Sequence, residues 1–410
     1  MERRKFIGVL GAAPLAAYVL SKGDTLSAGG QNDGFAAGEN GSRDACIEVN
    51  LDHIGHNLAQ IRKRVRVPVM PVVKANAYGH GLIEVSRFLE GQGVQGLMVG
   101  KLDEAVRQRA AGIKVKILNF GPFGPSDCAE IVGRDICQTI TSEDAFHLDE
   151  AASKAKKQAA VDLHIDTGMN RAGVPWEKAL DLIVKLSTRS HIKIEGVSTT
   201  LTEDPEFDRE QIKKLVDISQ VAKEKGISLG LRHAASSAGI MASPELILDM
   251  VRPGIMIYGY YANSQAQKED ALGLRPALRL LGSVTYTKEL APGESLSYHR
   301  ALKAQARMRI ATVGLGYSDG YPTQIVGKGS VSIRGKKFPV VAAVTANHLM
   351  IDLVNDPDIK MGDEVVLIDN QKDSGLTADI IADWSGISDY RLLIGLNPLL
   401  PRTYKAKSEM

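Results

Sequence analysis

Short apolar runs alternate with amphipathic stretches from about residue 67 to residue 260 of the chain. Within the stretches, apolar residues recur every three or four positions, which is the spacing of one helix face. Helices are expected in the segment that follows the 68–73 run and ends near residue 91, over 103–111 and over 209–225. The apolar runs predict strands over 68–73, 96–99, 115–118, 161–165, 192–197, 229–233 and 255–258. Strands that alternate with helices predict parallel βαβ units.

About eight such repeats favour a closed (β/α)8 barrel of the TIM type over an open parallel sheet. An open, doubly wound sheet is the structural alternative, but no Gly-x-Gly-x-x-Gly segment opens any of the expected helices. We therefore expect an α/β fold in which a barrel domain occupies residues 44–273.

The pattern changes after about Leu274. Segments that alternate with period two, such as 307–313 and 364–368, are separated by Gly and Pro, and helical periodicity returns only over 377–384. Alternation of this kind predicts strands with one buried face. A C-terminal, mostly-β domain is expected over 274–410, with residues 46–51 as a candidate first strand.

The composition is that of a globular protein without a polyanionic partner. The 410 residues include 50 basic and 48 acidic side chains, a net charge of +2, and no basic run that would suggest nucleic-acid binding. Three cysteines follow no metal-ligand spacing, and no metal site is expected. Cys128 and Cys137 leave two interpretations open: a small disulfide loop, or two unlinked small hydrophobic residues.

The N-terminus has the parts of an export signal. Arg3 and Arg4 precede an apolar stretch over 8–20 and small residues over 27–29, and the stretch is too short for a stable membrane anchor. The Arg-Arg-x-Phe-Ile order favours a twin-arginine signal, with an ordinary secretory signal as the alternative. Residues 1–43 are thus interpreted as a signal peptide and a flexible spacer, and the protein is expected to be exported to the periplasm.

Lys74 is the first candidate for chemistry. It ends an apolar strand at the carboxyl end of the predicted barrel, where catalytic side chains of such barrels lie. Partial loss of solvation there lowers the pKa of a lysine and permits covalent chemistry with a carbonyl group. On this residue alone, a solvated lysine in a loop is an equally good interpretation.

Several motifs in one order extend this observation across both predicted domains. They are Lys-Ala-Asn-Ala-Tyr-Gly-His-Gly at 74–81, Asp-Thr-Gly-Met-Asn-Arg at 166–171, His-Ala-Ala-Ser-Ser-Ala at 233–238, Val-Arg-Pro-Gly-Ile at 251–255, Ser-Tyr at 297–298, Gly-Tyr-Ser-Asp-Gly-Tyr at 316–321, Tyr390 and Pro-Arg at 401–402. In these motifs the chain resembles the alanine racemase family, whose members depend on pyridoxal 5'-phosphate and have the fold-type III architecture. The resemblance implies a racemase that interconverts L- and D-forms of a free amino acid.

The resemblance also implies roles for individual residues. Lys74 would carry the cofactor and act as the base on one face of the substrate, and Tyr298, from the partner subunit of a head-to-tail homodimer, would act on the other face. Residues implied to bind the cofactor are Tyr78, Arg171, His233, Ser237, Arg252, Gly254, Ile255 and Tyr390. Residues implied to contact the substrate are Arg171, Tyr317 at the entrance, Ala346 and Asn347.

Arg252 is implied to face the pyridine nitrogen of the cofactor. A guanidinium does not readily give up a proton, so the ring nitrogen would stay unprotonated and withdraw electrons weakly. Quick return of the proton to the substrate is then favoured over transamination, as racemisation requires.

The chain departs from the family near the substrate. His164 stands where the family has a lysine whose carbamate fixes the arginine at 171, and a histidine could orient Arg171 by hydrogen bonding. Thr200 replaces a histidine of the tyrosine network, and the run containing Ala346 and Asn347 replaces Cys-Met-Asp. Together with the export signal, Asn347 resembles periplasmic broad-specificity amino-acid racemases.

Two other functions stay open. The first is a degenerate protein that binds pyridoxal phosphate without turnover. His164 and Thr200 keep this alternative open, because both differ from the residues of the family. The second is a decarboxylase of the same architecture, which Arg252 argues against, because decarboxylases need a protonated ring nitrogen. Glu104 is interpreted as an ordinary helix residue near the barrel mouth.

Overall fold

The structure is a computed structural model and describes residues 45–262 and 264–406. The predicted signal peptide and spacer lie outside these residues. No helix within them is long and apolar enough to cross a membrane. Nor do they contain a group of three or more His, Cys, Asp or Glu side chains that could hold a metal ion.

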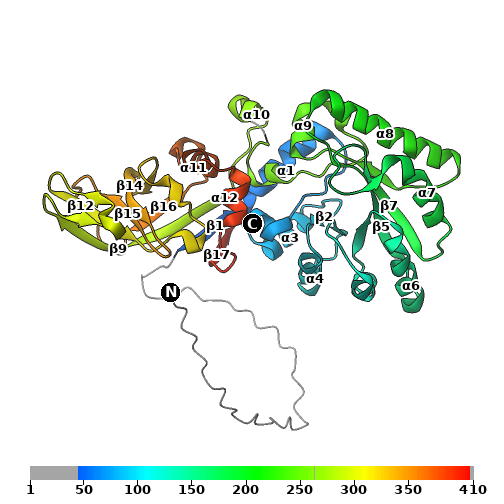
Figure 1. Cartoon of the computed structure of the whole chain (residues 1–410), viewed down its shortest axis with the longest axis horizontal. Coiled ribbons are helices and arrows are strands. Elements are labelled where there is room, and N and C mark those ends of the chain that lie inside the picture. The colour runs from blue at the N-terminus through cyan, green and yellow to red at the C-terminus, as the bar shows by residue number, and fades with distance from the viewer. Residues whose placement is uncertain (1–44, 263, 407–410) are drawn as a thin grey trace, which may run out of the picture. The chain divides into compact units, whose positions relative to one another are not determined.

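The N-terminal part is a closed barrel of parallel strands (Figure 1). Its ladder runs in the order β2 (Leu97–Val99), β3 (Ile117–Asn119), β4 (Cys137–Ile140), β5 (Ala159–Asp166), β7 (Ile192–Ser198) and β8 (Leu231–His233), and β6 (Val174–Pro175) pairs with β5. Parallel bridges His233–Met250, Val251–Val69 and Val72–Met98 close the circle. The predicted TIM-like barrel is thereby confirmed.

The strands differ from the prediction at two places. The segment Ile255–Tyr258 is a 3-10 helix, η4, and the last barrel strand is instead the short stretch around Met250 and Val251. All four η4 residues are buried, and a short apolar run buried on every side has no periodicity that separates strand from helix. The prediction also passed over β4, because its sequence Cys-Gln-Thr-Ile is half polar.

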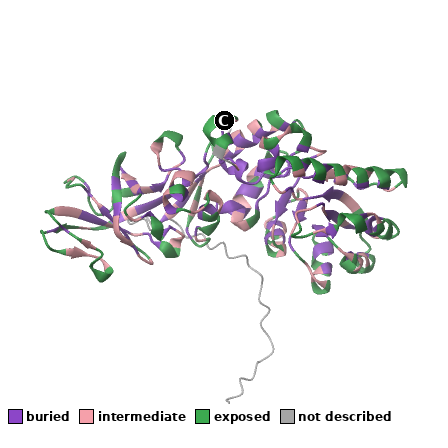
Figure 2. Cartoon of the chain, turned by 45° about the horizontal axis from the view of Figure 1, so that its top comes forward, coloured by how far each residue is buried: buried purple, intermediate pink, exposed green. Residues whose placement is uncertain are grey.

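Helices surround the barrel, and the longer ones bury one side and expose the other (Figure 2). They are α1 (Leu51–Val65), α2 (Lys74–Tyr78), α3 (Leu82–Gly91), α4 (Leu102–Ala110), α5 (Cys128–Gly133), α6 (Phe146–Ala155), α7 (Trp176–Ser187), α8 (Pro205–Glu224), α9 (Ser237–Ala242) and α10 (Ser264–Glu269). The longest, α8, begins where the Asp204 side chain accepts hydrogen bonds from the backbone N–H groups of Glu206 and Phe207.

The C-terminal part is a β domain, as predicted. Its sheet runs in the order β12 (Met308–Val313), β15 (Leu349–Asp352), β14 (Lys336–Val344), β13 (Ser330–Ile333), β16 (Glu364–Ile368), β9 (Leu278–Leu290), β1 (Cys46–Asn50) and β17 (Arg402–Lys405). Because β12 also pairs with β9, the sheet closes on itself and β1 and β17 extend it. The hairpin β10 (Ser295–Leu296) and β11 (Leu302–Lys303) and the helices α11 (Ala378–Ser385) and α12 (Asp389–Gly395) complete the domain.

The N-terminal strand β1 belongs to this C-terminal sheet. It lies antiparallel to β9 and parallel to β17, with Ile47 opposite Leu280 on one side and Arg402 on the other. The cysteines form no disulfide: Cys128 and Cys137 are free thiols, both buried. Their side chains therefore pack as small hydrophobic residues.

Candidate active site

Lys74 lies at the carboxyl end of the first barrel strand, at the start of α2. Its Cβ and Cδ lie beside Gly100, and the residue is partly open to solvent. Surrounding protein, followed by the positive charges of Arg171 and Arg252, lowers the pKa of Lys74, and the negative charge of Glu104 opposes them. A larger fraction of the amine is therefore neutral near pH 7 than in a solvated lysine, as attack on a carbonyl carbon requires.

The turn that follows Lys74 is left-handed. Residues 75–78 all have φ between 52° and 57°, although none is glycine. Such a conformation costs about 1–2 kcal/mol per residue. Hydrogen bonds inside the turn offset part of this cost, from the Ala77 N–H to the Val73 carbonyl (2.9 Å) and from the Gly79 N–H to the Ala75 carbonyl (3.1 Å). Strain of this kind clusters at functional sites, and here the turn ends at Tyr78, whose buried ring stacks on Tyr258.

Glu104 supports this turn, and its interpretation as an ordinary helix residue was wrong. The buried carboxylate accepts hydrogen bonds from the Asn76 N–H (3.3 Å) and from the Gly100 N–H (3.1 Å). It thus joins the strained turn to the end of the neighbouring strand β2. No sequence signal identified this role, because Asn76 lies 28 residues from Glu104 in the sequence.

A small cradle of donors lies beside the turn. The Ser237 hydroxyl accepts hydrogen bonds from the N–H groups of Gly254 (3.0 Å) and Met256 (3.3 Å). A side chain on Gly254 would place its Cβ only 2.4 Å from Tyr78 Oη. Hydroxyl groups and backbone N–H groups at close approach are a donor set that suits a phosphate.

Replacing Gly254 with alanine is expected to weaken binding of pyridoxal phosphate about tenfold, because the new methyl group displaces the Tyr78 hydroxyl. Fluorescence titration of the apoprotein with the cofactor measures this. Gly133→Ala is the matched control, since no atom lies within 4 Å of a Cβ at that position. Equal affinity in the two variants would contradict the proposed cradle.

Tyr390 of α12 reaches the same place from the C-terminal domain. Its ring lies 5.9 Å from that of Tyr78, which stacks on Tyr258 at 5.0 Å. Burial raises the pKa of Tyr78 and of Tyr390, so both phenols keep their protons and remain hydrogen-bond donors. The structure thus brings Tyr78, Ser237, Gly254 and Tyr390 together; Ile255, next to Gly254, is fully buried.

Arg252 is buried in the barrel beneath the mouth. Its Nη2 donates to the carbonyls of Thr199 (2.7 Å) and Ala234 (3.2 Å), while its buried Nε has no partner among the described residues. Burial lowers the pKa of Arg252 to about 10, against the opposing charge of Asp162, so the group is still a cation at neutral pH. An unpaired buried donor is costly, which points to a ligand atom that accepts from it.

His233 is also buried, and it faces an acid that sequence analysis missed. Its Nε2 donates to Asp162 Oδ2 at 2.6 Å, and Asp162 Oδ1 accepts from the Ser198 hydroxyl at 2.6 Å. His233 therefore supports the site from inside the barrel. The signal was available in β5, where period two places Asp162, His164 and Asp166 on one face of the strand.

His164 does not make the contact with Arg171 that the sequence suggested. Its Nδ1 is hydrogen-bonded to the Ser198 hydroxyl (3.1 Å) and its Nε2 to the Thr200 hydroxyl (3.4 Å). The rings of His164 and Phe120 make an edge-to-face contact. Burial, and then the charge of Arg252, lowers the pKa of His164 to about 3, so the ring is neutral. Ser198 at the end of β7 and Thr200 just after it thus occupy both ring nitrogens, and neither is available to Arg171.

Arg171 lies in an exposed loop after β5. The loop is fixed by Asp166, whose Oδ1 accepts from the N–H groups of Gly168 (2.9 Å) and Asn170 (3.0 Å). Gln211 of α8 ties the same loop to the end of β7, since its amide donates to Thr167 Oγ1 (3.2 Å) and to the Thr200 carbonyl (2.9 Å). The backbone is fixed, and the charge of Arg171 acts on Lys74.

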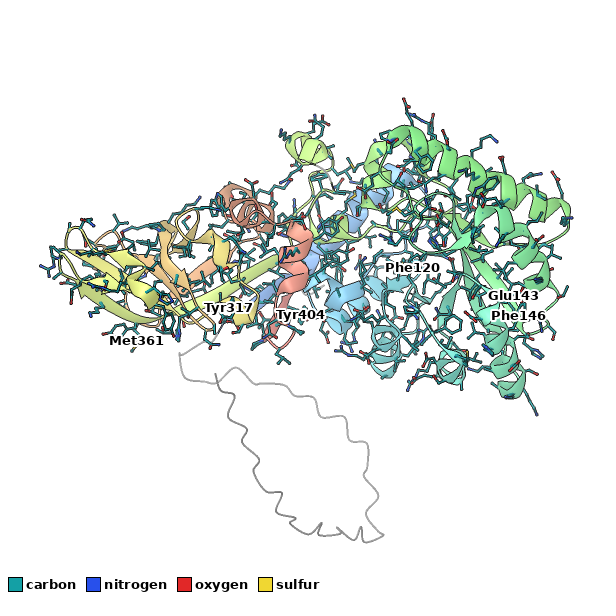
Figure 3. All side chains as sticks on the ribbon, viewed as in Figure 1. Phe120, Glu143, Phe146, Tyr317, Met361 and Tyr404 are labelled. Atoms are coloured by element: carbon teal, nitrogen blue, oxygen red, sulfur yellow. The ribbon has the colours of Figure 1, made fainter. Side chains whose placement is uncertain are left out.

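The predicted substrate residues Tyr317, Ala346 and Asn347 lie together on the β domain. Tyr317 begins η6 (Tyr317–Asp319), and its N–H donates to the Thr345 carbonyl at 2.9 Å. The Asn347 side chain donates to Ser318 Oγ (3.0 Å), which donates to the Ala346 carbonyl (2.7 Å). Figure 3 shows Tyr317 on the ribbon of the β domain and Phe120 on that of the barrel.

Tyr298 stands apart from both groups. It lies in η5 (Tyr298–Arg300) at the tip of the β10–β11 hairpin, with 74% of its surface exposed. Positive φ angles at Ser297, His299 and Arg300 hold the tip in a tight turn. Tyr317 is 55% exposed, so two predicted active-site tyrosines of one chain face outward.

The residues at the barrel mouth fit pyridoxal phosphate. The cradle around Gly254 suits the phosphate, Lys74 suits the aldehyde, and the unpaired Arg252 Nε suits a ring nitrogen that accepts a hydrogen bond. These are three chemically different groups of one small molecule.

Comparisons with known proteins agree over nearly the whole described chain. The family model for the alanine racemase N-terminal domain matches residues 49–262, and that for the alanine racemase C-terminal domain matches residues 277–404. Alanine racemase 1 of Clostridium acetobutylicum is 35% identical over 375 residues, 90% of this chain and 97% of that protein. An alanine racemase of Clostridium perfringens is 36% identical over 380 residues, 90% and 98% of the two chains.

Solved structures give the same result. The alanine racemase of Clostridium difficile 630 superposes with a TM-score of 0.84 at 33% identity, over 90% of this chain and 97% of that one. An alanine racemase from a D-cycloserine-producing Streptomyces lavendulae also superposes with a TM-score of 0.84. Its identity is 27%, over 89% of this chain and 98% of that one. The protein is a pyridoxal-phosphate-dependent amino-acid racemase, and the chain belongs to the alanine racemase family.

Proposed function

We propose that Lys74 and Tyr298 move the proton between the two faces of the substrate. Bound pyridoxal phosphate supplies an electron-withdrawing system that makes the Cα proton of the amino acid acidic. Lys74, with its lowered pKa, takes the proton at Nζ on one face and returns it there in the reverse direction. The observation that carries this proposal is the grouping of Lys74, the Gly254 cradle and the unpaired Arg252 Nε at one barrel mouth.

Tyr298 acts on the opposite face as the second base, through its phenolic oxygen. We place it in the active site of a second copy of the chain, in a head-to-tail homodimer. Its exposure at a hairpin tip supports this arrangement, because a base needs a site that encloses its reacting atom.

A mixture of two inactive chains tests the dimer. Chains with Lys74→Ala and chains with Tyr298→Phe are unfolded and refolded together. A shared site predicts that each mixed dimer contains one intact pair, so racemase activity returns. If every site were built from a single chain, the mixture would stay inactive.

The substrate range is proposed to extend beyond alanine. Ala346 and Asn347 present a small and a neutral side chain beside Tyr317, so neither bulk nor charge there restricts a longer amino acid. The resemblance to broad-specificity racemases and the N-terminal signal motif support the same conclusion.

We also propose that the protein is exported. A reporter fused to residues 1–43 should leave the cytoplasm, and the double substitution Arg3→Lys and Arg4→Lys should block a twin-arginine route.

Chiral analysis of products tests the substrate range. Purified, cofactor-loaded protein is given L-alanine, L-serine, L-lysine, L-arginine and L-methionine separately. Turnover of the long side chains is expected. Turnover of alanine and serine alone would contradict the broad range and leave a racemase with a narrow pocket. Cofactor binding without any turnover would identify a degenerate cofactor-binding protein.

A further inference from the structure

Two pairs of contacts join the same two strands inside the barrel. Asp162 bonds to Ser198 and His233, the last residues of β7 and β8. Arg252 Nη2 bonds to the carbonyls of the next residues along the chain, Thr199 and Ala234. The acid therefore fixes the two strand ends one residue before the carbonyls that hold the guanidinium.

Hydrogen-bond directions around Asp162 follow from its charge. An ionised carboxylate can only accept hydrogen bonds, so the Ser198 hydroxyl donates its single proton to Asp162. Ser198 must then accept from His164 Nδ1–H, which leaves His164 Nε2 as an acceptor for the Thr200 hydroxyl. On its other side, Asp162 accepts from His233. One negative charge thus orients a chain of four side chains.

Charge also links Asp162 to the site. Burial by itself would raise the pKa of Asp162, but the charge and hydrogen bond of His233, then Ser198 and Arg252, lower it below its usual value. In return, Asp162 raises the pKa of Arg252, and it also raises the pKa of Lys116. Asp162 is the acid that compensates the buried guanidinium.

Gly196 leaves the space that this carboxylate occupies. A Cβ at Gly196 would lie 2.2 Å from Asp162 Oδ2 and 3.1 Å from His233 Nε2. Any larger residue would push the acid away from His233. The position of Asp162 is thus built into β7 as well as β5.

We propose that Asp162 is a positioning residue that holds the strand ends on which Arg252 is seated and balances its charge, and so sets how tightly Arg252 Nε binds the cofactor's ring nitrogen. The inference rests on the proposed function, since it concerns the residues that hold pyridoxal phosphate. Asp162 is assigned no contact with the cofactor or the substrate. It acts through its hydrogen bonds with His233 and Ser198 and through the attraction between its negative charge and the positive charge of Arg252.

Three variants separate charge from hydrogen bonding. Asp162→Asn removes the charge and keeps the shape, Ser198→Ala removes one hydrogen bond and keeps the charge, and Asp249→Asn removes a half-buried acid that pairs with Arg232. The measurements are cofactor affinity by fluorescence titration of apoprotein, pH titration of the visible absorbance of bound cofactor, and the melting temperature. The first two respond to the site, and the third responds to folding.

Asp162→Asn should weaken pyridoxal phosphate binding by about tenfold or more, the effect of losing a charged hydrogen-bond system. It should also move the absorbance midpoint to lower pH, since the uncompensated charge of Arg252 disfavours a proton on the Lys74 nitrogen. Ser198→Ala should change affinity less, and Asp249→Asn should change only the melting temperature.

Wild-type affinity and midpoint in Asp162→Asn would overturn the inference. If that variant does not fold, Gly196→Ala displaces the carboxylate with its charge retained and must also weaken binding; unchanged affinity there overturns the inference too. Failure of the wild-type protein to bind the cofactor would overturn the proposed function itself, a separate result.

Discussion

Replacing Lys74 with alanine is expected to lower the rate of racemisation by about 10³-fold or more, because one residue supplies both the covalent link to the cofactor and a base. The structure supports this with a lysine at the barrel mouth whose pKa is lowered by burial and by Arg171 and Arg252. Chiral chromatography of product from L-alanine measures the effect.

The control for this prediction is Lys101→Ala. Lys101 is an exposed lysine that precedes α4, after a neighbouring strand of the same barrel. Its loss should leave racemisation within about twofold, as for a surface residue. Wild-type activity in Lys74→Ala would refute the assignment of the active site at this mouth.

The second large effect is expected for Tyr298→Phe. Loss of the phenolic oxygen should lower racemisation by about 10²- to 10⁴-fold, the usual contribution of a general acid or base. Because Lys74 remains, proton exchange should continue for one enantiomer. Incubation in deuterated water followed by mass spectrometry should show deuterium entering one enantiomer of alanine and not the other.

Tyr286→Phe is the matched control, since Tyr286 lies on β9 and is 57% exposed. It should exchange and racemise both enantiomers as the wild type does. Symmetric loss of exchange in Tyr298→Phe would contradict a two-base mechanism and would indicate that the tyrosine supports the fold or the dimer instead.

The sequence predicted the architecture because the pattern of each strand and helix is local. Apolar residues at alternate positions marked β5 and the first half of β7, and helical spacing marked α8. The errors occurred where burial is complete or the strand is very short. Ile255–Tyr258 is apolar because it is enclosed on every side, and the Met250–Val251 strand is too short to show a period.

The site was predictable in its list of residues and less so in its geometry. Motifs located Lys74 and Arg252, but the left-handed turn over 75–78 contradicts the preferences of its alanines. Such a turn depends on partners distant in sequence, such as Glu104, which sequence analysis could not pair with Asn76. Likewise, the strand sequence contained His164, but only the tertiary structure shows that Ser198 and Thr200 occupy its ring nitrogens.

The place of β1 between β9 and β17 has a consequence for biosynthesis. The strand β1 is synthesised before β9, and the partner of Ile47 on its other side, Arg402, is synthesised later still. Loop-closure entropy grows slowly with length, whereas folding slows as contacts become more distant in sequence. The strand β1 therefore has neither neighbour until β9 has been synthesised, and its other edge stays unpaired until β17 follows. During that time the unpaired strand is open to chaperones and to aggregation.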